Sequence, residues 1–178
     1  MISKVIGLFL LLNGILFGIF GAYLVWERNM PVDFAHTNNA KTNSDSTGVN
    51  YPTIIKFPKL ELELPISPTR ITNGKWDDPK HSVAFWQDSV LPGEAGNSVF
   101  YGHNWPNIFS KLKKSNIGDD IEISFNDGTL ITFVIQNTYT VTADQIHILN
   151  QTEDSRLTIY TCTGFLDSKR FVVIAVQK

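Results

Sequence analysis

An apolar run near the N-terminus, residues 5–26, most constrains what this chain can fold into. Asn13 and four glycines are the only interruptions in it. At ~1.5 Å per residue, a helix over this run spans a hydrocarbon core of ~30 Å. Tyr23 and Trp26 stand where the aromatic belt of a membrane interface is expected. The run therefore predicts a transmembrane helix, and we assign residues 1–28 as an N-terminal membrane anchor.

A cleavable signal peptide is the alternative interpretation of this run. Its apolar region would extend over only ~7–15 residues and end in a small-x-small cleavage site. The run here is longer, and it ends in Tyr23-Leu24-Val25-Trp26. We therefore expect an uncleaved, single-pass anchor. Lys4 and the amino terminus favour a cytoplasmic N-terminus, which places the rest of the chain outside the cell membrane.

The remainder of the chain divides into a polar linker, residues 29–50, and one domain, residues 51–178. The chain of 178 residues has 15 Lys and Arg against 17 Asp and Glu, for a net charge of −2. That balance excludes electrostatic binding of nucleic acid. A single cysteine, Cys162, excludes an intramolecular disulfide and a cysteine-rich zinc site.

Short β-prone runs dominate the domain and predict an all-β fold, a small barrel or sandwich. We expect strands at residues 53–57, 59–65, 98–101, 121–125, 131–135, 138–142, 157–161 and 171–176. Their spacing leaves no room for parallel crossovers, so antiparallel pairing is expected throughout. The last run, Phe-Val-Val-Ile-Ala-Val, is apolar enough to be buried on both faces.

One or two short helices are expected beside the strands. Pro106 suits a first helical turn, and Ile108, Phe109 and Leu112 share one face of the following stretch. Three lysines crowd its end, where cations stabilise a helix.

The candidate chemistry lies at predicted strand ends. Cys162 follows the run at 157–161, which places its thiol at a rim rather than in a barrel interior. The alternative is that Cys162 is simply a small buried hydrophobic residue, as most free cysteines are. In an exported domain, however, an unpaired thiol is a liability unless it is used. His103 follows the run at 98–101, and Gly102 before it allows close backbone approach.

Arg170 lies eight positions after Cys162, across a short loop. Two strands joined by that loop would place Cys162 and Arg170 side by side, where a guanidinium favours a thiolate and holds an oxyanion. The alternative is a solvated turn arginine. The other three histidines, His36, His81 and His147, are expected to be structural or inert.

Four segments in order resemble the sortases, membrane-anchored cysteine transpeptidases of bacterial cell walls. Thr158-Ile159-Tyr160-Thr161-Cys162 resembles the family's Thr-Leu-x-Thr-Cys signature. Residues 91–103, Leu-Pro-Gly-Glu-Ala-Gly-Asn-Ser-Val-Phe-Tyr-Gly-His, resemble its approach to the Gly-His pair. Residues 57–66 resemble its opening strands, and Lys169-Arg170-Phe171-Val172-Val173 its arginine strand.

The resemblance implies an eight-stranded sortase barrel that cleaves a Leu-Pro-x-Thr-Gly-like sorting signal of surface proteins. The acyl group would pass through a thioester to an amine of the cell wall or of a pilin. Cys162 corresponds to the nucleophile, His103 to the acid and base, and Arg170 to the oxyanion-stabilising arginine. Thr161 and Asn104 are expected to contact substrate, although Asn104 differs from many relatives, so their substrate preference is not carried over.

No cofactor is expected. Glu153 and Asp154 could suggest calcium, as in some relatives, but two adjacent acids are more often a solvated loop. The short Cys-to-Arg loop favours the smaller class D, E or F sortases. Two other functions are kept: an exported cysteine hydrolase, and a catalytically inactive, membrane-tethered peptide-binding domain.

Overall fold

The computed structural model describes residues 2–32, 34, 50–73, 75–77 and 79–178. Most of the predicted linker lies outside these residues. The chain separates into two units, Met1–Pro31 and Val32–Lys178.

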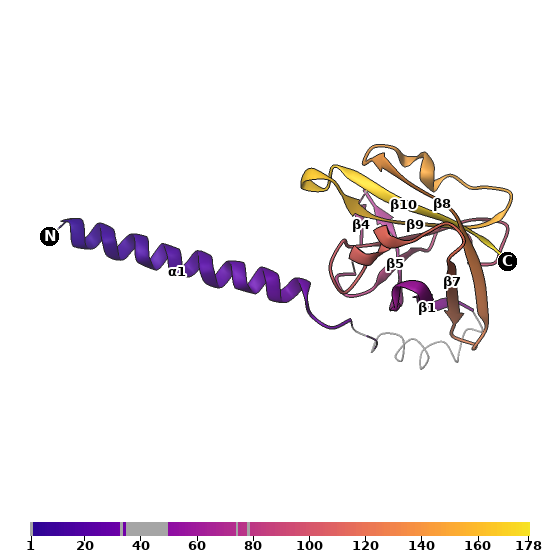
Figure 1. Cartoon of the computed structure of the whole chain (residues 1–178), viewed down its shortest axis with the longest axis horizontal. Helices are drawn as coiled ribbons and strands as arrows, with labels where there is room; N and C mark the ends of the chain where they lie inside the picture. Colours follow the sequence, from indigo (N-terminus) through magenta and orange to yellow (C-terminus); the bar gives the residue numbers. More distant parts are fainter. Residues whose placement is uncertain (1, 33, 35–49, 74, 78) are drawn as a thin grey trace. The chain divides into compact units, whose positions relative to one another are not determined.

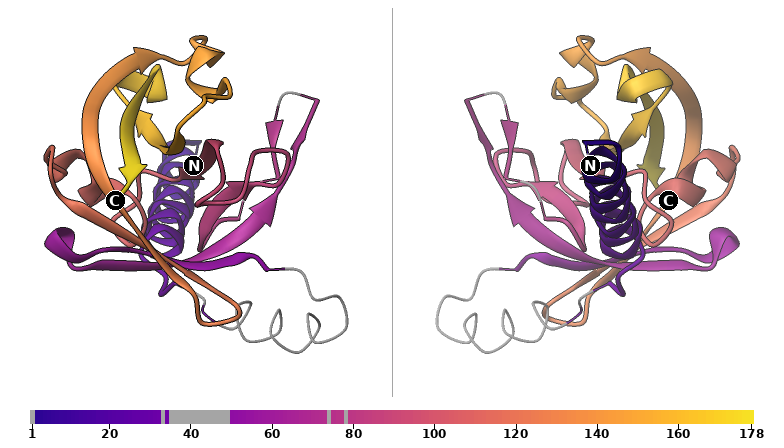
Figure 2. Two further views of the ribbon diagram at one scale, coloured as in Figure 1. Left: turned by 90° about the vertical axis from the view of Figure 1, so that its right-hand side faces the viewer. Right: turned by 90° about the vertical axis from the view of Figure 1, so that its left-hand side faces the viewer.

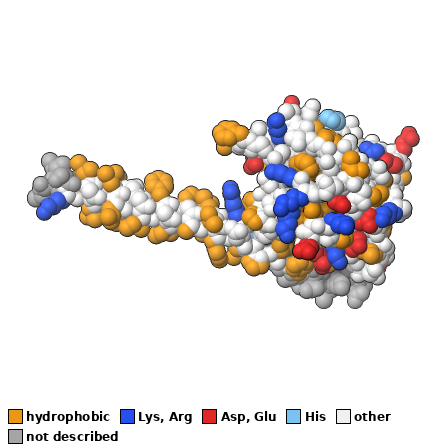
Figure 3. All heavy atoms as spheres, viewed as in Figure 1, with side chains coloured by type: hydrophobic (Ala, Val, Ile, Leu, Met, Phe, Trp, Pro, Cys, Tyr) orange, Lys and Arg blue, Asp and Glu red, His pale blue; other side chains and the backbone are white. Residues whose placement is uncertain are grey.

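The first unit is one helix, α1 (Ile2–Arg28). Its stretch Lys4–Arg28 is long and apolar enough to cross a membrane. The large apolar side chains described along it are exposed, and Figure 3 shows them in orange on the face in view. Asn13 donates its side-chain amide to the carbonyl of Phe9, one turn back, at 2.8 Å. A hydrocarbon environment offers this amide no other hydrogen-bond partner, so the bond within the helix satisfies it.

The second unit is a closed eight-stranded barrel, as the sequence predicts (Figures 1 and 2). The strands follow one another around it in the order β1-β2-β5-β6-β9-β10-β8-β7, and β7 pairs with β1 to close it. Their bounds are β1 (Pro52–Phe57), β2 (Leu62–Thr69), β5 (Val83–Trp86), β6 (Gly96–Gly102), β7 (Asp120–Phe125), β8 (Leu130–Thr142), β9 (Ser155–Thr163) and β10 (Lys169–Gln177).

The connections carry short elements only. A two-stranded sheet of β3 (Ile71–Thr72) and β4 (Lys75–Trp76) lies between β2 and β5. Four 3₁₀-helices lie among the described residues: η1 (Pro58–Leu60), η2 (Ser110–Lys114), η3 (Ile146–Leu149) and η4 (Phe165–Asp167).

Apolar side chains on two faces of the strands form two separate clusters. The barrel interior holds the larger one, to which β10 contributes Val173 and Ala175. A second cluster lies on the opposite face of β6, β9 and β10 and includes Val172 and Ile174. Because successive residues of a strand point to opposite faces, the last strand is buried on both sides, as its composition predicts. The outer cluster is covered by η3, whose Ile148 is buried in it.

The expectation of purely antiparallel pairing is wrong at two places. β2 pairs parallel with β5, and β6 pairs parallel with β9. The crossover from β6 to β9 is not a helix: residues 103–154 include η2, the β7–β8 hairpin and η3. The β7–β8 hairpin of the same barrel thus forms part of the crossover between the parallel strands β6 and β9, a connection that is usually an α-helix in α/β proteins.

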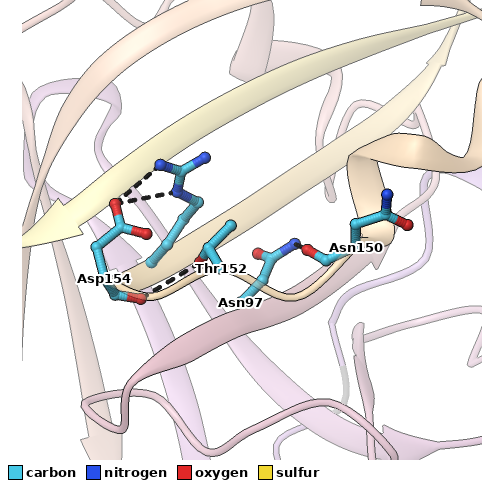
Figure 4. A network of polar contacts seen from close by, with 5 residues as sticks. Asn97, Asn150, Thr152 and Asp154 are labelled. Atoms are coloured by element: carbon cyan, nitrogen blue, oxygen red, sulfur yellow. Dashed lines mark hydrogen bonds and ion pairs between the residues drawn. The ribbon is translucent and has the colours of Figure 1, made fainter.

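A side-chain network anchors this crossover at the start of β6 (Figure 4). Asn97 is buried, and its amide donates to the carbonyls of Ile148 at 3.1 Å and Asn150 at 3.0 Å. Its backbone N–H donates to the side chain of Gln151 at 3.0 Å. These bonds tie the segment that enters β9 to the start of β6, next to the first residue pairs of the parallel register.

Several predicted boundaries differ from the structure. The run at 59–65 begins as η1, because Pro58 suits a first helical turn and Glu61 adopts a left-handed backbone with φ 48°. The runs at 131–135 and 138–142 are one strand, β8, with a register shift opposite Ile174 and Ala175. β5 was not predicted. Only residues 110–114 of the expected helix are helical, although Ile108, Phe109 and Leu112 are buried together as predicted.

Candidate active site

Cys162 and Arg170 lie directly opposite each other on neighbouring strands. The antiparallel register of β9 and β10 pairs Arg170 with Cys162 and Phe171 with Thr161. Both residues are near the ends of their strands, next to the loop that contains η4, and both side chains are half-buried. The prediction that a short loop pairs Cys162 with Arg170 on neighbouring strands is confirmed.

His103 reaches the same end from the other side of β9. The parallel register of β6 and β9 ends with Gly102 beside Thr161, so the next residues along the two strands, His103 and Cys162, follow in the same direction. The hydroxyl of Thr161 donates to the carbonyl of Gly102 at 2.7 Å and holds the strand ends together. The structure thus brings the thiol, the imidazole and the guanidinium to adjacent strands at one end of the barrel.

Thr161 itself lies inside the barrel wall with no exposed surface. Its hydroxyl is used by the strand pairing rather than presented to a ligand. The Thr161 hydroxyl thus takes part in strand pairing, and the expected contact of Thr161 with substrate stays a prediction. Asn104, the other expected contact, is half-buried in the loop after His103.

Two aromatic residues beside His103 were missed by the sequence analysis. The hydroxyl of Tyr101 lies 3.5 Å from Nδ1 of His103 and 3.7 Å from Sγ of Cys162. The ring of Trp105 stacks on the imidazole with centroids 4.3 Å apart and planes 9° apart. Strand alternation offers a signal for Tyr101, because residues two apart share a face. Trp105 follows the strand end, where no such rule applies.

Arg170 is held by the loop that follows Cys162. Its Nη1 donates to the carbonyl of Asp167 at 2.8 Å and to that of Lys169 at 2.9 Å. The loop turns through left-handed Leu166 and Asp167, with φ of 50° and 57°. A guanidinium carries five N–H donors, and the bonds that Arg170 makes to described residues use its Nη1 group.

The other three histidines differ in where they lie relative to Cys162, His103 and Arg170. His147 is exposed on η3, and His36 is outside the described residues. The His81 ring is half-buried 6.3 Å from that of Trp105, so it reaches the same aromatic group as His103.

Asp154, one of the two acids that could suggest calcium, accepts hydrogen bonds from an arginine. The guanidinium of Arg156 donates to Oδ2 of Asp154 at 2.8 and 3.3 Å, and these bonds lower the pKa of the Asp154 carboxyl (Figure 4). Among the described residues, no group of three or more His, Cys, Asp or Glu side chains is arranged to hold a metal ion.

Replacing Gly102 with alanine is expected to destabilise the barrel and displace His103. A Cβ there would lie 2.5 Å from Cδ2 and 2.8 Å from Cε2 of Phe109, whose ring is fully buried. Overpacking of this kind costs about 1–3 kcal/mol, measurable by urea unfolding. The double variant with Phe109→Leu should be less destabilised than the sum of the two single variants. Strict additivity would show that the ring and Gly102 do not interact.

Replacing Trp105 with leucine removes the flat surface behind His103 while keeping an apolar side chain. Because a stacked aromatic pair contributes about 0.5–1.5 kcal/mol, we expect kcat/KM to fall about 2- to 10-fold. Trp86→Leu on β5 serves as the control, because Trp86 packs against the outer cluster. An equal loss of kcat/KM in both variants would contradict a specific role for the stacking of Trp105 on His103.

Comparisons with known proteins agree with the fold. Residues 55–178 match the family model of the Sortase domain. None of the curated proteins matches.

Solved sortase structures resemble this chain at low sequence identity. A Clostridium perfringens sortase D5 transpeptidase is 21% identical with a TM-score of 0.64, over 82% of this chain and 91% of the other. Sortase C1 of Streptococcus agalactiae is 24% identical with a TM-score of 0.60, over 71% and 66%. Sortase A of Corynebacterium diphtheriae is 23% identical with a TM-score of 0.62, over 72% and 60%. The chain thus spans less than two thirds of the length of these last two proteins.

Proposed function

The chain belongs to the sortase family, and we propose that it is a cysteine transpeptidase that cuts a Leu-Pro-x-Thr-Gly-like sorting signal. One observation carries this proposal. His103, Cys162 and Arg170 meet at one end of three adjacent strands, β6, β9 and β10. This arrangement supports the roles of Cys162 as nucleophile, His103 as acid and base, and Arg170 as anion-binding group.

The chemistry of amide transfer suits these three groups. The thiolate of Cys162 attacks the scissile carbonyl and forms a tetrahedral oxyanion, which the guanidinium of Arg170 stabilises. His103 protonates the leaving amine as the thioester forms. It then takes a proton from the incoming amine, which attacks the thioester and releases Cys162 as the thiolate.

The acceptor amine belongs, in this proposal, to a peptidoglycan precursor or to a pilin lysine. The short loop between β9 and β10 supports a small sortase of class D, E or F. The resemblance to a protein described as a sortase D5 transpeptidase, of which this chain covers 91%, agrees with that assignment.

We assign α1 as the membrane anchor and residues 51–178 as the catalytic domain, attached by the linker at 29–50. The domain is placed on the outer side of the cell membrane, where sorting signals and acceptor amines are found. The length and apolar composition of Lys4–Arg28 support the anchor. A cleaved signal peptide would instead yield a mature protein lacking α1, which N-terminal sequencing of the protein from both the membrane fraction and the culture medium detects.

Intact-mass spectrometry tests the proposed reaction. The full chain in detergent is mixed with a pool of sorting-signal peptides, with and without a small amine. We expect an acyl adduct on Cys162 that the amine discharges, and the mass of the adduct identifies the cleaved motif. Peptides of the same composition in scrambled order are the matched control and should give no adduct.

Two other outcomes separate the alternative functions. An adduct that water discharges as fast as the amine does would indicate an exported cysteine hydrolase. No adduct, together with a thiol that fails to react with a small electrophile, would indicate a membrane-tethered domain that only binds peptide. Either result would overturn the transpeptidase assignment.

A further inference from the structure

The hydroxyl of Tyr101 lies near both the thiol of Cys162 and the imidazole of His103. It is 3.7 Å from Sγ of Cys162 and 3.5 Å from Nδ1 of His103. Strand register explains this position. Tyr101 pairs with Tyr160 across β6 and β9, and Tyr101 and His103 are two positions apart, as are Tyr160 and Cys162. These side chains therefore project from the same, outer face of the barrel.

The ring of Tyr101 is held on both sides. Its centroid lies 5.3 Å from that of Tyr160 and 5.8 Å from that of His103, the latter in an edge-to-face arrangement. Trp105 in turn stacks on the imidazole of His103. The phenol is thus fixed by packing, whereas its O–H bond rotates and can be directed toward either neighbour.

A phenol suits this place because it both donates and accepts a hydrogen bond. A thiol proton can be donated to the phenol oxygen while the phenol proton is donated to Nδ1 of the imidazole. The three groups then form a continuous chain from sulfur to nitrogen.

We propose that Tyr101 is a further catalytic residue, which relays the proton between Cys162 and His103. The proton of the Cys162 thiol moves to the phenol oxygen as the phenol proton moves to Nδ1 of His103. The products are a thiolate and an imidazolium, and Tyr101 ends as a neutral phenol. The reverse transfer restores the resting pair after the amine has attacked. The assignment rests on the proposed function, but its first test needs no sorting signal.

Alkylation of Cys162 by iodoacetamide tests the relay in the full chain in detergent. The rate is followed by intact mass at a series of pH values, for the wild type and for Tyr101→Phe. The variant keeps the ring and loses only the hydroxyl. Without the phenol the thiolate loses a hydrogen bond, so a higher pH is needed to reach the same thiolate fraction. We expect the midpoint of the profile to move to higher pH and the rate at pH 7 to fall roughly 10-fold or more.

Tyr139→Phe is the matched control. Tyr139 also packs against the outer cluster, but it lies on β8, which β10 separates from β9. Its profile should match that of the wild type. An unchanged profile in Tyr101→Phe would overturn the relay, and so would an equal shift in both variants, since that would reflect the cluster as a whole.

If the Tyr101→Phe variant fails to fold, a second measurement on the wild type tests the relay. Acetylation of the wild-type Cys162 by p-nitrophenyl acetate is followed in mixtures of H₂O and D₂O. Two protons moving together give a bowed dependence of rate on deuterium fraction, which supports the relay, whereas a straight line contradicts it. Failure of the proposed function would look different: no peptide would acylate Cys162, while its alkylation would still depend on Tyr101.

Discussion

Replacing Cys162 with alanine is expected to abolish acyl transfer while leaving the barrel folded. The thiol is the atom that bonds to the substrate, and no other cysteine is present in the chain. Loss of a nucleophile in enzymes of this kind lowers kcat on the order of 10⁴-fold or more. The side chain is half-buried near a strand end, so the cost in stability should stay below about 1 kcal/mol. Product release from a sorting-signal peptide and thermal unfolding measure the two effects.

Cys162→Ser separates nucleophilicity from shape, because it keeps a side chain of nearly the same size. It should fold as well as the wild type and remain almost inactive, since an unactivated hydroxyl is a poor nucleophile. Transfer at a near-normal rate in the alanine variant would show that the reacting group lies elsewhere.

Replacing Arg170 with lysine should lower kcat/KM roughly 100-fold or more. The guanidinium uses Nη1 to hold the carbonyls of Asp167 and Lys169 and still presents Nε and Nη2. An ammonium has three donors on one atom and cannot do both. Loss of an oxyanion donor alone costs about 10²–10³ in rate. The acylation rate at saturating peptide is the decisive measurement.

Lys169→Ala is the matched control for that variant. Lys169 is the neighbouring cation, it is exposed, and its backbone carbonyl, which the variant keeps, accepts a hydrogen bond from Arg170. Its removal should change the acylation rate by less than about 2-fold, because exposed charges contribute little. Equal losses in the two variants would mean that net charge, rather than the planar guanidinium, is what the site needs.

Local patterns predicted most strands and the pairing of Cys162 with Arg170. Alternation marked β7, where Ile121, Ile123 and Phe125 are buried in the interior. The composition of β10 predicted burial on both faces. The spacing from Cys162 to Arg170 predicted their pairing because a hairpin is a local structure, whose register follows from its loop.

Pairing between distant strands did not follow from local patterns. Nothing within residues 96–102 indicates that β6 lies parallel to β9, because that choice depends on how the β7–β8 hairpin packs. The position of His103 beside Cys162 was therefore supplied by the family resemblance. Tyr101 was overlooked for the same reason, because Cys162, whose thiol its hydroxyl approaches, is 61 positions away in the sequence. The bonds of Arg170 to its own loop depend on side-chain geometry that no pattern encodes.

The parallel pairing of β6 with β9 also sets the time at which this molecule gains its reactivity. A growing chain that ends before β9 contains the imidazole and the phenol but no thiol. When Cys162 is added, it acquires these neighbours only after the intervening hairpin has closed and the distant strands have met, which is a slow, late event. Labelling of Cys162 with a mild electrophile should therefore report the last stage of barrel assembly during refolding.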